Sequence, residues 1–395
     1  MVAMPASRGV PILAWIAASP GRAFGAFLTL HAALWTALPA LLCPNLPPNL
    51  IEALVYGREW QLGYGKLPPL PWLLVDIMHR LIGHDFAYYL LAQVAVVAAF
   101  GVVFMMARPL LGALGALAAV LIVDGLHTFN YTAPKFEPDV MHLPFWALAG
   151  FALHRALRDG GIRHWLLLGV ALAALLIVMA PHLVGLVSND FSPFAYAEHR
   201  ALQFFAGQLV LLIPSLLIAV PLFWPRRALD QKMIGRIALI WAIVFAGLAL
   251  AFIGNYGVLP NYDHRYRAEF FPGDELGREL SQRYRASTGQ PLAYVIGGLW
   301  VGGNVEHYAP EQPRLLIDGR PSRAPWIDLN DLRARGAVVV WTDGDLNVMP
   351  PALRTIAADA AVQPPLTLPF RRGDQVLDVG WAILLPKPSY ASAAP

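Results

Sequence analysis

The chain has 395 residues, of which 57% are hydrophobic and 14% charged, and its formal net charge is +3. In soluble domains roughly a quarter of all residues are charged. The lower charged fraction of this chain means that much of it cannot face water. The small net charge does not indicate nucleic-acid binding. The single cysteine, Cys43, excludes an intramolecular disulfide framework and a cysteine-based metal site.

Charged residues are distributed unevenly along the chain. None lies between Phe24 and Leu42, whereas the stretch from Asn261 to Arg285 carries one every few positions. This change in composition predicts a boundary near Pro260. The predicted division is a transmembrane domain over residues 1–260 and a soluble α/β domain over residues 261–395.

The apolar segments before Pro260 predict a mainly α, polytopic transmembrane bundle. A helix needs about 20 apolar residues to cross ~30 Å of hydrocarbon. One segment, Leu110–Val123, is shorter and follows Pro109 directly, and it completes a set of seven crossings. The predicted spans are Phe24–Leu42, Phe86–Ala107, Leu110–Val123, Val140–Leu157, Trp165–Val187, Phe204–Trp224 and Ile237–Leu259.

Lysine and arginine residues between the spans support seven crossings and give an orientation. With the N-terminus in the cytoplasm, ten of them fall in the inner connections and five in the outer ones. That asymmetry is the one that the positive-inside rule describes. Leaving out Leu110–Val123 would invert every later loop and remove the asymmetry. We therefore expect the C-terminal domain to lie outside the cytoplasm.

The first outer loop, from Cys43 to Gly83, is long and has the pattern of a structured segment. Glu52, Tyr56 and Glu59 are spaced at i, i+4 and i+7, which places them on one face of a helix. We expect this helix to lie in the membrane interface. The glycines and prolines of the following stretch, residues 63–70, then end it in a rigid bend.

The residues after Pro260 alternate between strand-like and helix-like periods, which predicts a small α/β sheet. The expected strands are Leu292–Ile296, Arg314–Ile317, Ala337–Trp341, Leu366–Phe370 and Val376–Leu385. The expected helices are Gly273–Ala286, Val301–Tyr308, Leu329–Arg335 and Pro351–Ala360. The glycines at 297–303 fit close packing of a strand on a helix better than a phosphate-binding turn, because they match neither common phosphate motif.

Acidic residues in the outer loops are the candidates for chemistry. Asp139 stands before the apolar run Val140–Leu157, where it either caps a helix or belongs to a site, since carboxylates beside hydrocarbon are costly. The outer histidines show no metal-binding spacing. We therefore expect no cofactor, and ligand spacing does not indicate a divalent metal.

Three patterns in the outer loops carry a family resemblance. They are Glu52-x-x-x-x-Gly57-Arg58-Glu59-x-x-Leu62-Gly63-Tyr64-x-Lys66-x-Pro68-Pro69-Leu70, then Phe136-x-Pro138-Asp139-x-x-x-x-Pro144-Phe145-Trp146-Ala147-Leu148, then Ala180-Pro181-His182-Leu183 with Asn189-Asp190-Phe191. In this order they resemble motifs of the dolichyl-phosphate-mannose-type transferases, which are family 39 and aminoarabinose-transferase-like enzymes of the C-type (GT-C) membrane glycosyltransferase fold. The resemblance covers roughly residues 24–260.

The resemblance implies a protein of the bacterial inner membrane with a periplasmic C-terminal domain. Its reaction would move a sugar from a polyprenyl-phosphate carrier to an acceptor hydroxyl, with Glu52 or Asp139 as the general base. A cation such as Lys66 would assist the departing phosphate. The substrate-binding residues that the resemblance implies are Arg58, Glu59, Tyr64, Lys66, Lys135, His182, Asn189 and Asp190. Besides the carrier-linked sugar, the expected partners are membrane lipids.

The sequence also departs from the family pattern. Where relatives carry a second acid before the glutamate, this chain has Asn49, Leu50 and Ile51, and Leu67 replaces a histidine. A family segment with a Lys-Tyr motif is missing between Gly169 and Met179. These differences leave open a non-catalytic relative that binds a glycolipid or a partner. A transporter is less favoured, because the spans hold few polar residues.

Overall fold

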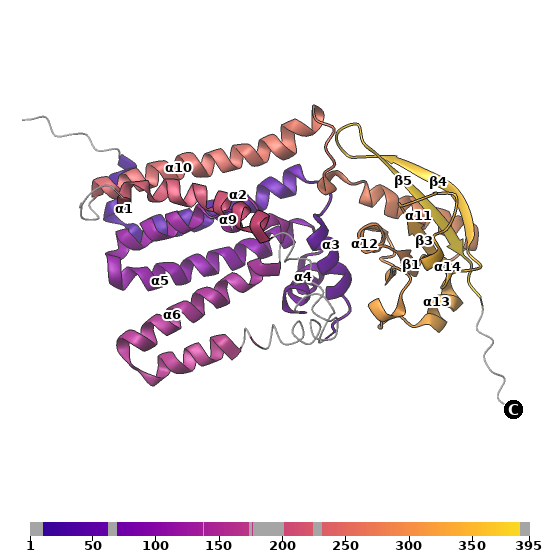
Figure 1. The fold of residues 1–395 in the computed structure, drawn as a ribbon, viewed down its shortest axis with the longest axis horizontal. Helices are drawn as coiled ribbons and strands as arrows, with labels where there is room; N and C mark the ends of the chain where they lie inside the picture. Colours follow the sequence, from indigo (N-terminus) through magenta and orange to yellow (C-terminus); the bar gives the residue numbers. More distant parts are fainter. Residues whose placement is uncertain are drawn as a thin grey trace, which may run out of the picture. The chain divides into compact units, whose positions relative to one another are not determined.

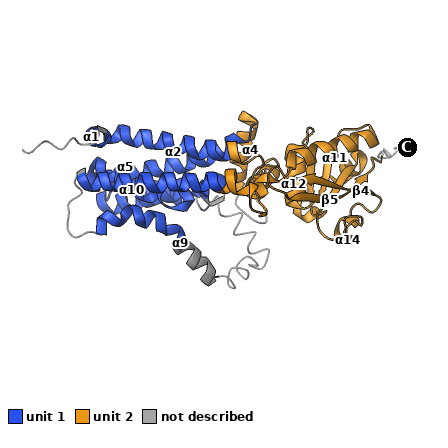
Figure 2. Ribbon diagram, turned by 90° about the horizontal axis from the view of Figure 1, so that it is seen from above, with its two compact units in different colours: residues 1–40, 84–254 blue, residues 41–83, 255–395 orange. Residues whose placement is uncertain are grey.

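A computed structural model describes residues 11–61, 69–136, 138–173, 176, 201–223 and 231–387 (Figure 1). The chain forms two compact units, which Figure 2 distinguishes by colour. Unit 1 comprises residues 1–40 and 84–254, and unit 2 comprises residues 41–83 and 255–395. The expected division at residue 260 is therefore wrong for the first outer loop, which belongs to the same unit as the C-terminal residues.

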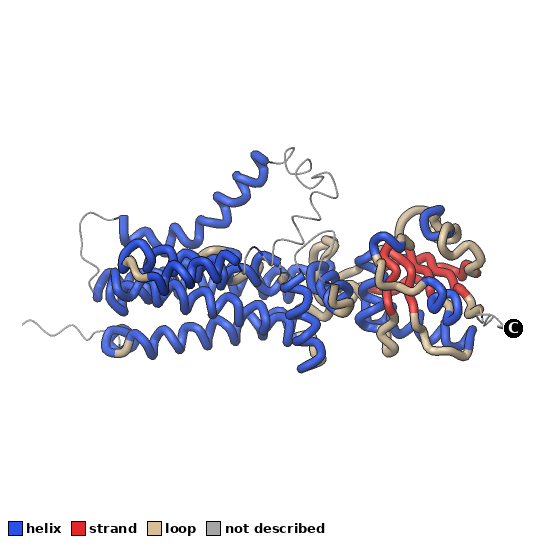
Figure 3. Tube along the Cα trace, turned by 90° about the horizontal axis from the view of Figure 1, so that it is seen from below, coloured by secondary structure: helices blue, strands red, loops and turns tan. Residues whose placement is uncertain are grey.

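Unit 1 is built from helices alone within its described part (Figure 3). Three of its helical stretches are long and apolar enough to cross a membrane: Pro20–Leu42, Phe86–Asp124 and Lys232–Asn261, the last of which runs on into unit 2. The helices of the unit are α1 (Pro11–Ala18), α2 (Pro20–Leu42), α5 (Phe86–Asp124), α6 (Leu143–Asp159), a stretch at Ile162–Ala173, α9 (Ala201–Ala219) and α10 (Gln231–Ile253). Short 3-10 turns connect them at His127–Phe129, Ala133–Lys135, Pro138–His142 and Val220–Phe223.

Helix α5 contains two of the predicted spans and reverses direction between them. Gly112 breaks the helix with φ 71° and ψ 175°, a backbone that glycine adopts readily. An unbroken helix would separate Phe100 from Asp124 by about 36 Å, at 1.5 Å per residue. Instead the His31 ring lies 5.3 Å from the Phe100 ring while its Nδ1 lies 3.0 Å from Asp124. The short segment after Pro109 thus packs back against the first.

Two predicted spans differ from the observed helices at their ends. Helix α6 begins at Leu143, and the preceding residues Pro138–His142 form a 3-10 turn, so Asp139 is not the cap of this helix; His142 holds that position. The expected span Trp165–Val187 is described as a helix only over Ile162–Ala173. The orientation of the spans stays a prediction.

Unit 2 combines the first outer loop with a five-stranded sheet. The loop supplies α3 (Pro48–Gly57) and α4 (Pro69–Ile82). The C-terminal part begins with turns at Gly254–Val258, Leu259–Asn261 and Ala268–Phe270, and it continues with α11 (Gly273–Thr288), β1 (Tyr294–Gly297), α12 (Leu299–Tyr308), β2 (Arg314–Ile317), a turn at Pro321–Arg323, α13 (Leu329–Arg335), β3 (Ala337–Trp341), α14 (Pro351–Arg354), β4 (Ala361–Pro369) and β5 (Val376–Leu384). This confirms the predicted fold class, a mainly helical membrane protein with a C-terminal α/β domain.

The sheet has the strand order β2-β1-β3-β5-β4. Strands β2, β1 and β3 pair in parallel, and β5 pairs antiparallel with both β3 and β4. The register of β4 against β5 shifts between Gln363 and Leu366, because the two prolines there have no N–H to donate to the ladder. Asp328 is the N-cap of helix α13, and its side chain accepts a hydrogen bond from the backbone N–H of Asn330 at 2.8 Å.

One predicted helix is much shorter than expected. The stretch Pro351–Ala360 has helical composition, but α14 ends at Arg354. Beyond the helix, Asp359 accepts a hydrogen bond from Arg333 at 2.7 Å and also pairs with Lys387. These contacts hold the chain away from a helical path. Strand β4 begins at Ala361, five positions earlier than predicted, since pairing with β5 overrides the local pattern.

Three of the glycines at 297–303, namely Gly297, Gly302 and Gly303, serve packing, as predicted. A Cβ atom added to Gly297 would lie 2.6 Å from Val340, and one added to Gly302 would lie 2.4 Å from Leu315. A Cβ atom on Gly303 would lie 2.7 Å from Ile51 and 3.0 Å from Val55, both on α3. The absence of a side chain at Gly303 therefore lets α12 approach α3 closely.

Candidate functional site

Helix α3 carries the first predicted catalytic residue, Glu52. The helix starts after Pro47 with Pro48 in its first turn, and it is buried by α4 and α12 from Leu50 to Gly57. Glu52 is only 7% exposed. Burial raises the pKa of Tyr56, one turn further on, and the nearby Glu52 charge raises it too, while Arg323 opposes both. Burial on all sides distinguishes this helix from the expected one, with one face in a membrane interface.

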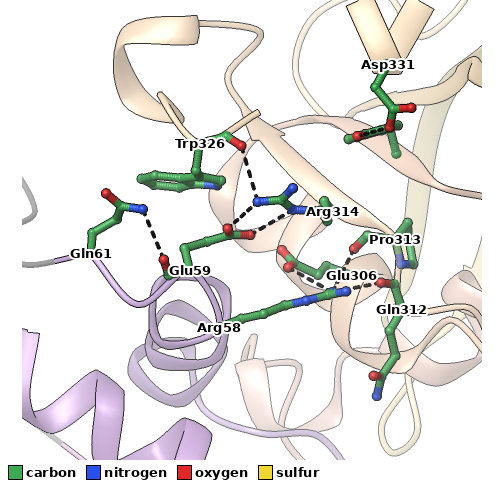
Figure 4. A network of polar contacts seen from close by, with 10 residues as sticks. Arg58, Glu59, Gln61, Glu306, Gln312, Pro313, Arg314, Trp326 and Asp331 are labelled. Carbon is green, nitrogen blue, oxygen red and sulfur yellow. Dashed lines mark hydrogen bonds and ion pairs between the residues drawn. The ribbon is translucent and has the colours of Figure 1, made fainter. Parts of the chain in front are cut away.

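Arg58 and Glu59 do not continue the helical face of Glu52, because α3 ends at Gly57. A Cβ atom on Gly57 would lie 2.2 Å from the Trp72 carbonyl oxygen, so α4 can pack here only against glycine. Three residues later, Trp60 has a positive φ of 47°. The turn directs the two charged side chains toward the C-terminal part of unit 2 (Figure 4).

The two charges are held there by ion pairs. Arg58 Nη1 donates to the Gln312 carbonyl at 2.7 Å and to Glu306 Oε1 at 3.4 Å. Glu59 accepts two hydrogen bonds from Arg314, one of them from Nε at 3.1 Å, and Arg314 also donates to the Trp326 carbonyl at 3.2 Å (Figure 4). Residues that the family resemblance implies for substrate binding thus also dock the motif-bearing loop onto α12 and β2.

Glu306 is the most perturbed acid of this network. It lies on α12 with a side chain that is 5% exposed. Burial raises its pKa from 4.5 to about 8, and the neighbouring Arg58 only partly offsets that increase. Near neutral pH Glu306 therefore carries little charge. Sequence reasoning missed this residue, although a lone acid within the otherwise uncharged stretch 299–308 is a recognisable signal.

A cavity of about 290 Å³ lies between α3, α4 and α12, all within unit 2. Arg58 and Arg80 are both among the residues that line it. Arg80 Nε donates to Asp76 Oδ2 at 2.6 Å, and Trp60 Nε1 donates to the same oxygen at 2.6 Å. The remaining wall includes Leu54, Val55, His79, Gly303, Glu306, His307 and Gln312. Neither Arg80 nor the two histidines was among the predicted site residues.

The other predicted site residues lie elsewhere or are not described. Asp139 falls in the turn Pro138–His142 of unit 1, where its side chain lies outside the described part. Lys135 ends the turn Ala133–Lys135, also in unit 1, and is half-buried. Outside the described residues are Tyr64, Lys66, His182, Asn189 and Asp190. The roles of Glu52 and Asp139, which belong to different units, therefore stay predictions.

Unit 1 holds a buried polar cluster that sequence reasoning also missed. Asp124 Oδ1 lies 3.0 Å from His31 Nδ1, and Asp124 Oδ2 accepts a hydrogen bond from Trp241 Nε1 at 2.6 Å. The other ring nitrogen of His31 lies 3.0 Å from the Phe129 carbonyl oxygen. His31 is 0% and Asp124 1% exposed. Three helices, α2, α5 and α10, thus meet at one carboxylate.

Across the described stretches from 11 to 387, no group of three or more His, Cys, Asp or Glu side chains is placed to hold a metal ion.

The helices and the sheet define a polytopic membrane protein with an α/β unit. Residues 66–225 match the family model described as dolichyl-phosphate-mannose-protein mannosyltransferase. The resemblance to this transferase family, predicted from the three motifs, is therefore confirmed over that range. No curated protein matches the chain. Among solved structures, the apo crystal structure of ArnT from Cupriavidus metallidurans is similar at 12% identity and a TM-score of 0.49, covering 96% of this chain and 100% of that one.

Proposed function

We propose that this protein is a membrane glycosyltransferase that uses a lipid-linked sugar donor. The observation that carries the proposal is the match of residues 66–225 to a mannosyltransferase family. The matched range includes Lys66, Asp139, His182 and Asp190, all of which the motifs single out. Helices long and apolar enough to cross a membrane support a donor that is itself embedded in lipid.

We infer a reaction in which an acceptor hydroxyl attacks the anomeric carbon of a polyprenyl-phosphate sugar. Glu52 or Asp139 takes the hydroxyl proton as the new glycosidic bond forms. The bond from the anomeric carbon to the phosphate oxygen breaks, and the phosphate leaves as an anion that Lys66 stabilises. Glu52 is buried, with 7% exposure, and it is the residue with which the first of the three motifs begins.

The proposal places the protein in the bacterial inner membrane. The N-terminus is then cytoplasmic and the reaction occurs on the periplasmic side, as the distribution of Lys and Arg predicts. The acceptor hydroxyl can belong to a lipid, a glycan or a protein.

Purified full-length protein, reconstituted in lipid and supplied with a panel of polyprenyl-phosphate sugars, tests the proposal. We expect release of free polyprenyl phosphate with at least one donor. Glu52→Gln and Asp139→Asn should each abolish that release, since an amide cannot accept the proton. Glu279→Gln, an exposed acid on α11, is the matched control and should retain full activity.

The same assay separates the proposal from its alternative. Donor binding without turnover by the wild-type protein would identify a non-catalytic relative. Unchanged turnover in either site variant would remove that residue from the mechanism.

A further inference from the structure

The cavity between α3, α4 and α12 contains two arginines that are anchored in the same way. Arg58 contacts Glu306 through Nη1 at 3.4 Å, and Arg80 contacts Asp76 through Nε at 2.6 Å. Both arginines line the cavity. An acidic side chain behind each guanidinium fixes its orientation, because a hydrogen bond from the charged guanidinium restricts the long side chain.

The two acidic side chains are buried, whereas the two guanidinium groups are partly exposed to solvent. The side chains of Asp76 and Glu306 are each 5% exposed, whereas Arg58 is 36% and Arg80 59% exposed. Within the described part of the chain, the hydrogen bonds of Arg58 leave from Nη1 and those of Arg80 from Nε. Each guanidinium has five N–H donors. Most of these donors therefore stay available to a molecule in the cavity.

The charge balance of the wall is positive. Arg58 and Arg80 are permanently charged, and Asp76 offsets one of them. Burial raises the pKa of Glu306 to about 8, so this acid adds little negative charge near neutral pH. The imidazoles of His79 and His307, whose ring centroids lie 5.8 Å apart, belong to the same wall. Among the charged groups of the wall, the two guanidinium groups thus outweigh the one ionised carboxylate.

We propose that this cavity is a binding site for a phosphate or carboxylate group borne on a head group of about one sugar ring. Guanidinium groups match the two oxygens of such an anion and bind it through paired hydrogen bonds. A volume of about 290 Å³ is at the small end for ligand pockets. Leu54 and Val55 supply an apolar wall for the carbon face of a sugar. This inference goes beyond the proposed transfer reaction, since it concerns binding alone and requires no turnover.

Calorimetric titration of the full-length protein in nanodiscs of neutral lipid tests the site. Glucose 6-phosphate and glucuronate represent soluble sources of the anion, and short-chain phosphatidic acid represents a lipid head group. Glucose is the uncharged control. We expect saturable binding of at least one anionic probe below about 10 mM, weakening as salt is added, and none of glucose. The probe that binds most tightly identifies the source.

Variants of Arg80 separate the proposed site from nonspecific attraction. Arg80→Gln should weaken binding about 10-fold, the loss of one charge-assisted pair. Arg80→Lys should bind at an intermediate level, because lysine keeps the charge but not the paired donors. Arg278→Gln, which removes an exposed arginine of α11, should leave binding unchanged.

Two results would contradict the proposed binding site. Absence of saturable binding by every anionic probe, or binding that Arg80→Gln does not weaken, would overturn the proposal. Neither result bears on sugar transfer, which is measured separately by release of the carrier phosphate.

Discussion

Glu59 and Arg314 are 255 positions apart in the sequence and form a two-point ion pair within unit 2. Glu59 is 6% exposed and Arg314 34% exposed. The hydrogen bond to Glu59, followed by the Glu59 charge, raises the pKa of Arg314 although its burial opposes this, so the guanidinium stays charged. The pair fixes the end of the motif-bearing loop to the start of β2. The C-terminal part of unit 2 therefore supports the loop that carries Glu52.

We predict that Arg314→Gln lowers the free energy of unfolding by about 3 kcal/mol, because it leaves the covered Glu59 charge without its partner. Chemical denaturation followed by the tryptophan fluorescence of the full-length protein measures the change. The exposed pair Arg278–Asp274 is the control, since its loss should change stability by less than about 1 kcal/mol. Equal effects of the two substitutions would contradict the structural role of the Glu59–Arg314 pair.

Gly57 and Gly303 should tolerate larger side chains poorly. Gly57→Ala places a methyl group 2.2 Å from the Trp72 carbonyl oxygen, so α3 or α4 must shift. Gly303→Val pushes against Ile51 and Val55 across the interface of α12 with α3. We expect each to lower stability by about 1–3 kcal/mol, as overpacking typically does.

Gly298→Ala is the matched control for the glycine series. The nearest atom to an added Cβ atom there is 3.9 Å away, on Asp318. Its φ of −63° suits any residue, so only a small loss is expected from the helix N-cap. A thermal melt of the three variants in the same detergent ranks them. Similar melting temperatures for all three would show that the close approach of α3 is not required.

The ionisation of Glu306 should be detectable in the pH dependence of the free energy of unfolding. Its pKa rises from 4.5 to about 8 on folding, so between these values the folded state holds a proton that the unfolded chain has lost. The contribution of Glu306 to stability therefore falls as pH rises from about 4.5 to about 8, by a few kcal/mol, and is constant above that range. Glu306→Gln should remove this slope, because the amide is neutral at every pH. The measurement is the difference between the free energies of unfolding of wild type and variant, followed from pH 5 to pH 9. An identical slope in the two proteins would contradict the assignment.

The sequence predicted the sheet better than the site, for a physical reason. Strands β2 and β3 and helix α13 were predicted to the residue, because alternation, glycine punctuation and the Asp328 cap are all local signals. The ion pairs of Arg58 and Glu59 depend on partners about 250 positions away, which no local pattern reveals. The same holds for His31, whose carboxylate partner, Asp124, belongs to another helix.

Cysteine labelling tests the predicted membrane topology. We predict that cysteines placed at Arg22 and Asp318, in a chain with Cys43 replaced by serine, react with a membrane-impermeant reagent from opposite sides. The inner position of Arg22 follows from the excess of Lys and Arg in the predicted cytoplasmic loops. Labelling of both sites in intact cells would refute the seven-span arrangement.

The cluster around Asp124 should be among the most sensitive positions of unit 1. Its carboxylate accepts a hydrogen bond from Trp241 Nε1 at 2.6 Å and lies 3.0 Å from His31 Nδ1, so Asp124→Ala deprives Trp241 on α10 and His31 on α2 of this carboxylate. Loss of one partner from a buried polar cluster costs about 3–5 kcal/mol. We expect a large drop in the temperature at which the detergent-solubilised protein aggregates. Asp124→Asn retains one acceptor oxygen and should be less harmful. Thr29→Ala, which removes an exposed hydroxyl from α2, should have little effect. If Asp124→Ala melts like Thr29→Ala, the cluster does not hold α2, α5 and α10 together.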